Sequence, residues 1–413
     1  MTSNFLNIKN IKLLNLEIAC LIALLIFLPS FEAPKNLFLL AYVFFALLRQ
    51  FKESRITHLD KLDYIFIAFF FSALFSSLFP VLHGHEWRGF RSFVTVFLFG
   101  WVFARTEYSK QTIKTLFLVS IFALLPPLFL GLYHLLWTKE LNFLLINSVG
   151  YVNASGLYLT TIASASLGYL LSLNLKRTNP YYYSFWIALI ILFNFSLLEA
   201  SSRSSFFALI ITSMLIIIFS KISYKKIFLS MFFLILVVCF FLKAPVFEKH
   251  MINLKNHDVL SQRDKLWNVS IETLRASPSL FGIGINNYGL VDEKMIKASV
   301  EDRNAFYNPN NYFYSTLNHN VYLASIVERG LFGALILITF MLYWAGRLYD
   351  GIKLLFRGDQ HFYLWAGSMT AFSSVFLVGF VHTTLVHEPG ILTFFFFGLY
   401  EIYCKFYLKI NKK

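Results

Sequence analysis

Residues 62–81, LDYIFIAFFFSALFSSLFPV, contain a single charged side chain, Asp63. A membrane hydrocarbon core about 30 Å thick needs roughly 20 apolar helical residues per crossing, so this stretch predicts a transmembrane helix. The whole chain has the same character, because 57% of its 413 residues are hydrophobic and 14% are charged. Soluble domains average about 25% charged residues. We therefore expect a multi-pass membrane protein and exclude a water-soluble enzyme or a disordered chain.

Twelve stretches are predominantly apolar, which predicts an all-α polytopic protein with about twelve transmembrane helices. They lie at residues 11–29, 35–49, 62–81, 90–105, 111–137, 151–173, 182–199, 204–220, 225–243, 320–347, 361–381 and 388–408. Pro126 and Pro127 interrupt the fifth stretch and predict a kink there. The chain then divides into spans 1–9 at residues 1–243, a long loop at 244–318 and spans 10–12 at 319–413.

The basic residues predict the orientation. Most of the 36 Lys and Arg residues fall in alternate connections and at both termini, and the short connections between them hold few. Positive charge is retained on the cytoplasmic side of membrane proteins, so we expect both termini in the cytoplasm and the loop 244–318 in the periplasm. This rule also accounts for the formal net charge of +14, so no nucleic-acid partner is needed to explain it.

The loop 244–318 is predicted to fold in part. Ser261-Gln262-Arg263-Asp264 is similar to a capping box with Ser261 as the N-cap, and Trp267, Ile271 and Leu274 follow at helical spacing. We expect a short amphipathic helix at about 262–276, ended by Pro278. The sequence Phe281-Gly-Ile-Gly-Ile-Asn-Asn-Tyr288 then predicts a tight glycine turn.

Arg203 lies in the short connection Glu199-Ala-Ser-Ser-Arg-Ser-Ser205, at the expected start of the eighth span and on the predicted outer side. Both the orientation rule and the helix macrodipole disfavour a cation there, the latter by about 0.3–1 kcal/mol. Pairing with Glu199 or contact with lipid headgroups is the ordinary explanation. The functional one is a binding site for an oligoanion.

Two further residues have the chemistry of an active site. Arg263 begins the predicted loop helix, where it is either a solvated charge, a cation–π partner of Trp267, or a phosphate ligand. His319 lies where the loop meets the tenth span, and an imidazole can accept a proton from a hydroxyl near neutral pH. Asn318, Asn320 and Tyr322 flank it and are candidates for fixing its tautomer.

Weaker candidates lie on the same predicted side. Arg88 and Arg91 are either phosphate ligands or interfacial anchors, and His83-Gly-His85-Glu86 is more typical of a polar loop than of a metal site. His382, His387 and Glu388 precede the last span, where a supporting polar role is open to them. No metal and no cofactor is predicted.

These motifs, in this order and topology, resemble those of the bacterial O-antigen ligases, within the O-antigen ligase and polymerase superfamily. Ser201-Ser-Arg203 opens a span, Gln262-Arg263 precedes Trp267, Pro278, Gly282 and Gly284, and His319-Asn320 is followed after nine residues by Gly330 and then Gly333. The last spacing fits the ligase pattern H-[NSQ]-x9-G-x-x-[GTY]. The resemblance covers most of the chain.

The resemblance implies a glycosyltransferase of the Gram-negative inner membrane, with its active site at the periplasmic face. Such enzymes transfer a glycan from undecaprenyl diphosphate to a sugar hydroxyl of lipid A–core, without a metal and with inversion. It implies that Arg203 and Arg263 bind the diphosphate and that His319 is the general base, supported by Gln262, Trp267, Asn320, Tyr322, Arg88 and Arg91. The implied partners are these two lipids and the bilayer.

Three other functions remain open on the sequence alone. An O-antigen polymerase uses the same donor with a lipid-linked acceptor, and a protein O-glycosyltransferase uses a protein acceptor. A multi-pass transporter is the alternative of another class, although transporters place ionisable residues near the middle of several spans. Here the predicted spans are nearly free of charge, with Glu17 the main exception.

Overall fold

The protein is helical throughout the part that a computed structural model describes, which is residues 2–53, 58–139, 141–146, 150–174, 178–220, 262–355, 360–385 and 387–408. The expected all-α class is confirmed for these residues. The elements are α1 (Thr2–Phe27), α2 (Glu32–Lys52), α3 (Lys61–Leu78), α4 (Glu86–Ala104), α5 (Lys110–Phe122), α6 (Leu125–Tyr133), the π-helical turn η2 (His134–Thr138), α7 (Val152–Ser172), α8 (Pro180–Glu199), α9 (Arg203–Phe219), α12 (Arg263–Ala276), the 3₁₀ turn η3 (Tyr288–Leu290), α13 (Glu293–Glu301), the 3₁₀ turn η4 (Pro309–Asn311), α14 (Val321–Leu355), α15 (Phe362–Phe376), the 3₁₀ turn η5 (Val378–Phe380) and α16 (His387–Phe406).

Six segments of the described chain are long and apolar enough to cross a membrane. They are Lys61–Leu78, Lys110–Thr138, Val152–Ser172, Pro180–Glu199, Val321–Lys353 and Phe362–Phe380, and Arg203–Phe219 is a shorter apolar helix. The chain is therefore a multi-pass membrane protein. The stretch 225–243, expected as the ninth span, lies outside the described residues. The count of twelve spans and the orientation stay predictions.

The predicted interruption of the fifth stretch is confirmed. A turn at Ala123 and Leu124 separates α5 from α6, and Pro126 and Pro127 lie in the first turn of α6. Proline is tolerated there because the first N–H groups of a helix have no intrahelical partner. The two helices thus continue in one apolar segment with a break in its middle.

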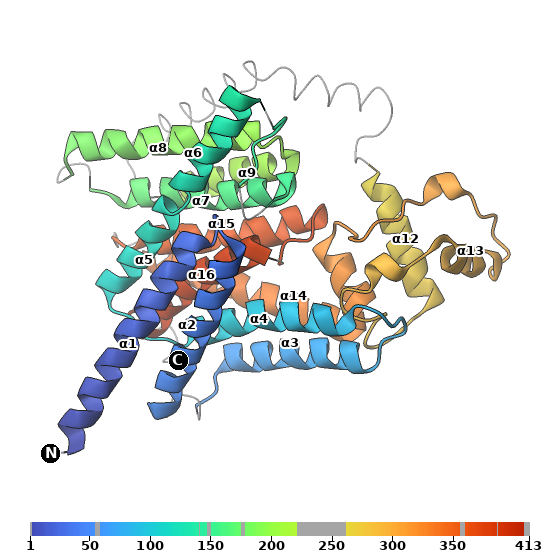
Figure 1. The fold of residues 1–413 in the computed structure, drawn as a ribbon, viewed down its shortest axis with the longest axis horizontal. Helices are drawn as coiled ribbons and strands as arrows, with labels where there is room; N and C mark the ends of the chain where they lie inside the picture. The colour runs from blue at the N-terminus through green and yellow to red at the C-terminus, as the bar shows by residue number, and fades with distance from the viewer. Residues whose placement is uncertain are drawn as a thin grey trace.

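α7, α15 and α16 form the centre of the bundle, and α3, α4 and α14 pack beside them (Figure 1). Small residues let α7 and α15 approach closely, since a Cβ added to Gly168 would lie 2.2 Å from the Cβ of Ala366. α12 and α13 lie together at one end of the bundle, and α1 begins at the opposite end (Figure 1). The described part of the segment predicted as a loop, residues 262–318, thus lies at one end of the apolar helices.

Several arginines that the sequence explains only as orientation charges are buried in ion pairs. Arg49 Nε lies 2.7 Å from Glu17 Oε2, and Arg347 Nε lies 2.9 Å from Glu401 Oε2. Arg105 pairs with Asp63 in the same way. Removing one partner of a buried pair typically costs about 3–5 kcal/mol. These residues therefore hold the helices together in addition to any effect on orientation.

Candidate functional site

Arg203 is the first residue of α9, as the sequence predicts. Ser201 turns the chain between α8 and α9 with a positive φ of 56°. The Ser202 hydroxyl then donates to Asn153 Oδ1 at 3.2 Å and lies 2.9 Å from the Ser205 hydroxyl. A Cβ added to Gly156 would lie 2.5 Å from the Cβ of Ser202, so the turn is packed directly on α7. The largely buried helix α7 thus supports the backbone that carries Arg203.

Arg263 is the first residue of α12, which confirms the predicted helix to within one residue. The prediction that Ser261 is the N-cap is wrong, because the N-cap is Gln262 and its side chain makes no capping bond. Gln262 has a φ of 61°, a left-handed conformation that cannot continue a helix. The helix therefore starts one residue later than a capping box at Ser261 requires.

The rest of α12 is anchored to the remainder of the loop. The Tyr288 hydroxyl donates to the carbonyl of Leu266 at 2.9 Å and accepts from Ser270 at 3.2 Å. Val269 of the same helix joins a small apolar core with Ile283 and Val327. Arg263 thus lies at the start of a helix that packs against the rest of the loop.

The two arginines interact, although they are 60 positions apart in the sequence. Burial lowers the pKa of Arg263, and the charge of Arg203 lowers it further. Each guanidinium also lies in the first turn of a helix, where the macrodipole contributes roughly half a positive charge. The two guanidinium groups and the N-termini of α9 and α12 thus all contribute positive potential. A bound oligoanion would stabilise such an arrangement.

Burial lowers the pKa of His319 below its ordinary value of 6.5, and the charge of Arg263 lowers it further. His319 is therefore close enough to Arg263 for the two side chains to interact electrostatically. Its φ is 49°, an uncommon conformation for a residue with a Cβ. Backbone outliers of this kind cost about 1–3 kcal/mol and persist only where the surroundings enforce them. Arg263 thus interacts electrostatically with both Arg203 and His319, the other two residues that the sequence analysis singles out.

Asn320 and Tyr322 hold the backbone around His319. Asn320 Oδ1 accepts from the N–H groups of Tyr322 and Leu323 at 3.0 Å, and its Nδ2 donates to the carbonyl of Phe380 at 2.9 Å. The Tyr322 hydroxyl donates to the carbonyl of Phe376 at 2.8 Å. These bonds tie the start of α14 to the end of α15. They reach main-chain atoms, so the expectation that the two side chains fix the tautomer of His319 is not supported.

The partner of the His319 ring is His382. Their Nδ1 atoms lie 3.3 Å apart and their rings are stacked at 20°. Burial, followed by the charges of His319 and Arg263, lowers the pKa of His382 to about 3. In this hydrogen bond one Nδ1 carries a hydrogen and the other accepts it. The lowered pKa values of both rings favour their neutral forms near pH 7. If His319 is the donor, its Nε2 keeps a lone pair and is free to act as a base.

Four buried polar atoms next to these residues have no hydrogen-bond partner within the described part of the chain. They are Ser204 Oγ, Trp267 Nε1, Asn318 Nδ2 and Thr383 Oγ1. Each belongs to a residue next to, or one helical turn from, Arg203, Arg263, His319 or His382. A buried polar group without a partner costs about 1–3 kcal/mol, so such groups in a native protein call for an explanation. A polar ligand in this region would provide the missing bonds.

The glycines of the loop join it to α14. Gly330 has a φ of 67° and interrupts α14, and a Cβ at this position would lie 2.2 Å from the carbonyl oxygen of Leu280. The N–H groups of Ile283 and Gly284 donate to the carbonyls of Val327 and Glu328 at 2.9 and 3.1 Å. The predicted glycine turn is confirmed, and it pairs with the first part of α14. The spacing from His319 to Gly330 is thus the length of the helical segment that the turn holds in place.

The weaker candidates lie at the start of α4. Backbone hydrogen bonds, that from Gly84 first, lower the pKa of Glu86 to about 2, and Asn287 of the loop donates to the same carboxylate at 3.2 Å. This carboxylate fastens α4 to the loop, in agreement with a polar loop rather than a metal site. Arg88 and Arg91 are exposed, so a role for them stays a prediction. Among the described residues, no group of three His, Cys, Asp or Glu is arranged to hold a metal.

Sequence reasoning gave little weight to His382, which is the direct neighbour of the imidazole it singled out. The available signal was topological, because two membrane crossings bring the end of the stretch 361–381 to the same side as the start of the stretch 320–347.

A search of curated proteins found no match. Over residues 186–338, a segment that contains Arg203, Arg263, His319 and Gly330, the chain matches the family model of O-antigen ligases, consistent with a member of the O-antigen ligase and polymerase superfamily.

Proposed function

We propose that this protein is an O-antigen ligase, which transfers a glycan from undecaprenyl diphosphate to a sugar hydroxyl of lipid A–core. The family match supports a ligase or polymerase-type function. The observation that supports the proposal is that the Arg203 charge acts on Arg263 and the Arg263 charge acts on His319, so that two cations and one imidazole are electrostatically linked.

The two arginines are proposed to bind the diphosphate of the donor. A guanidinium stays charged at any relevant pH, and its planar fork matches phosphate oxygens. Negative charge develops on the diphosphate as the glycosidic bond breaks, and fixed cations stabilise that charge most in a site partly shielded from water. Their placement at two helix starts adds the helix dipoles to the same effect. The arginines thus supply the charge for which other glycosyltransferases use a divalent metal, so we propose a metal-independent reaction.

His319 is the proposed general base. Its Nε2 would take the proton of the acceptor hydroxyl while the hydroxyl oxygen attacks the anomeric carbon. The bond from that carbon to the diphosphate oxygen breaks, and undecaprenyl diphosphate leaves with the electron pair. Attack opposite the leaving group inverts the anomeric configuration. A base in this role has to be neutral before the reaction, and the lowered pKa of His319 provides that near pH 7.

His382 is proposed as a positioning residue. By accepting the Nδ1–H of His319 it would select the tautomer whose Nε2 is basic and hold the ring in one orientation. In many enzymes a carboxylate accepts the hydrogen bond that orients a histidine base. His382 would make the same hydrogen bond without adding negative charge beside the donor diphosphate. The unpartnered atoms of Trp267, Asn318, Ser204 and Thr383 are the proposed ligands for sugar and phosphate oxygens.

Both substrates are lipids, so the reacting groups should meet at the membrane surface. We propose that the site faces the periplasm of a Gram-negative inner membrane and that α12 acts as a lid over it. A chain lacking residues 262–276 that still ligates would refute the lid.

The test is glycan transfer by purified protein with a defined undecaprenyl-diphosphate donor, lipid A–core as acceptor and a chelator present. The proposal predicts transfer that is abolished by Arg203→Ala, Arg263→Ala or His319→Ala while the amount of folded protein is unchanged. Elongation of lipid-linked glycan in place of transfer to lipid A–core would identify a polymerase instead. Glycosylation of a protein acceptor would identify a protein O-glycosyltransferase.

A further inference from the structure

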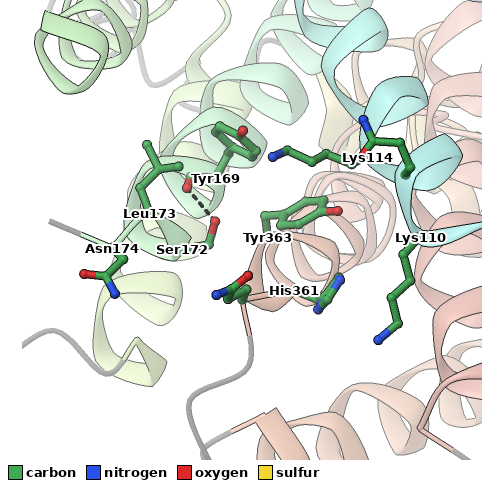
Figure 2. A pocket seen from close by; sticks show the side chains of 10 residues that line it. Lys110, Lys114, Tyr169, Ser172, Leu173, Asn174, His361 and Tyr363 are labelled. Carbon is green, nitrogen blue, oxygen red and sulfur yellow. Dashed lines mark hydrogen bonds between the residues drawn. The ribbon is translucent and has the colours of Figure 1, made fainter. Parts of the chain in front are cut away.

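A second site candidate lies among α5, α7 and α15. Residues of these helices and of the turns beside them enclose a cavity of about 370 Å³. It is lined by Lys110, Lys114, Tyr169, Ser172, Leu173, Asn174, His361 and Tyr363, which Figure 2 shows, together with Gln111 and Gln360. The two lysines lie on the side of the cavity opposite Ser172 and Asn174, and the Lys114 side chain extends toward Tyr169 (Figure 2).

This cavity is separate from the His319 site. Tyr363 of the lining lies at the start of α15, whereas His382 lies beyond the other end of this helix, after η5. At 1.5 Å per helical residue, α15 alone extends about 20 Å from Tyr363 to its end at Phe376. The cavity therefore lies at the opposite end of the bundle, which the distribution of basic residues predicts to face the cytoplasm.

The lining carries positive charge without a compensating carboxylate. Lys110 and Lys114 are both exposed, and none of the described lining residues is acidic. Lys110 also lies over the ring of Tyr407 at 5.1 Å. The carboxylate of Glu107 acts on Tyr407, but Glu107 does not line the cavity. The remaining lining side chains offer amide, hydroxyl and imidazole groups, which can donate hydrogen bonds to an anion.

The surroundings place the cavity opening at the level of lipid headgroups. The Tyr169 hydroxyl of the lining bonds with that of Tyr182 at 3.3 Å, in the first turn of α8. The same turn exposes 85% of Tyr181 and 39% of Tyr182. Tyrosines with this exposure at the end of an apolar helix are typical of the membrane–water interface. An anion that reaches the cavity along the membrane surface is therefore favoured over one from solution.

We propose that the cavity binds the phosphate group of an anionic phospholipid, held between Lys110 and Lys114 and the polar groups of α7 and α15. Basic pockets between membrane helices on the cytoplasmic side bind such headgroups in other proteins. A free phosphate would have the same contacts, but it would not use the exposed tyrosines beside the opening. The proposal does not depend on the transferase reaction.

The test compares two double variants of the full chain by native mass spectrometry of the delipidated protein. Lys110→Gln/Lys114→Gln removes both lining charges, and Lys52→Gln/Lys61→Gln removes two exposed lysines at the ends of α2 and α3, outside the cavity. Each is titrated with phosphatidylglycerol, with phosphatidylcholine and with inorganic phosphate. Thermal unfolding checks that both fold like the wild type.

We expect phosphatidylglycerol to bind the wild type and the Lys52/Lys61 variant equally, and the Lys110/Lys114 variant about tenfold more weakly. Phosphatidylcholine should bind all three alike, and inorganic phosphate should not displace the lipid. Equal binding by all three proteins, or an equal loss in both variants, would overturn the proposal. Displacement by inorganic phosphate would show that a soluble anion is the ligand and overturn the assignment to a lipid.

Discussion

The Nδ1 atoms of His319 and His382 lie 3.3 Å apart at the ends of two different apolar segments, α14 and α15. Both imidazoles have a pKa below the ordinary value of 6.5, and in each case burial is the first cause and the Arg263 charge contributes. Burial, with a smaller contribution from the Arg263 charge, therefore favours the neutral form of both rings. If Arg263 binds a diphosphate as proposed, the same charge would act both on the anion and on the protonation of the two imidazoles.

Removing His382 should slow the reaction without abolishing it. We expect His382→Ala to lower kcat about 10–100-fold, a smaller loss than the roughly 10²–10⁴-fold that a missing general base causes in His319→Ala. The KM for the donor should change little, because His382 has no proposed contact with it. His382→Asn should restore part of the rate, since its amide oxygen can accept the Nδ1–H. A loss of folded protein in parallel with activity, with no rescue by Asn, would indicate a structural role.

The protonation of His319 should respond to Arg263. Arg263→Gln removes a neighbouring positive charge, so the protonated imidazole becomes less unfavourable and its pKa should rise toward 6.5. The pH at which half of the His319 side chains are protonated should therefore rise. NMR of histidine-labelled protein in nanodiscs measures this without relying on activity. Arg275→Gln on the exposed end of the same helix is the matched control and should leave the titration unchanged.

Arg203 should contribute to diphosphate affinity through its charge and its geometry. Charge-assisted hydrogen bonds contribute about 1.5–3 kcal/mol. We therefore expect Arg203→Ala to raise the inhibition constant of undecaprenyl diphosphate by about 10–100-fold, and Arg203→Lys by less. Lys297→Ala removes a cation from the exposed surface of α13 and should have no effect. Equal inhibition of all these proteins by the diphosphate would remove Arg203 from the proposed site.

Two glycines of α14 should respond oppositely to alanine. Gly330→Ala places a Cβ 2.2 Å from the Leu280 carbonyl at a φ of 67°, so we expect a loss of about 1–3 kcal/mol in stability and a displaced loop. Gly346 has open space around it within the same helix, so Gly346→Ala should be neutral or stabilise by up to about 1 kcal/mol. Thermal unfolding in detergent measures both. Similar shifts in the two variants would argue against the contact at Gly330.

The buried ion pairs should matter for stability rather than for catalysis. Arg347→Met leaves Glu401 without its 2.9 Å partner, and the expected loss is about 3–5 kcal/mol. The double variant Arg347→Met/Glu401→Leu should recover most of it, because neither charge then remains buried alone. Thermal unfolding is again the measurement, with Lys297→Ala at an exposed pair as the control, expected to change stability by less than about 1 kcal/mol. A double variant as unstable as the single one would contradict this reasoning.

Apolar runs predicted the helices well, because a helix that crosses a membrane must satisfy its own backbone and bury no charge without a partner. The orientation rule and the helix macrodipole drew attention to Arg203, because both disfavour a cation at a helix start on the predicted outer side. The helical spacing of Trp267, Ile271 and Leu274 located the helix that begins at Arg263. These predictions depend on local sequence and on general physical penalties.

Other features depend on contacts between distant segments. Glu17 of α1 reaches Arg49 and Tyr108 only when α2 and the connection between α4 and α5 pack against α1. His382 becomes important only because η5 ends beside the start of α14, and nothing in its own neighbourhood distinguishes it from an interfacial histidine. The N-cap at Gln262 was missed because it has a left-handed backbone and no side-chain capping bond, whereas capping patterns consider side chains alone.

The break at Gly330 divides α14 into a short piece that begins just after His319 and a long piece embedded among the other helices. The short piece is bonded to the turn at Ile283 and Gly284, and that turn shares an apolar core with α12, which begins at Arg263. Arg263 is thus connected to the segment that follows His319 through the packed loop, and Asn320 and Tyr322 bind that segment to the end of α15 and to η5. A local change in the packing of α12 would therefore alter the position of one guanidinium while the imidazole and Arg203 kept their places.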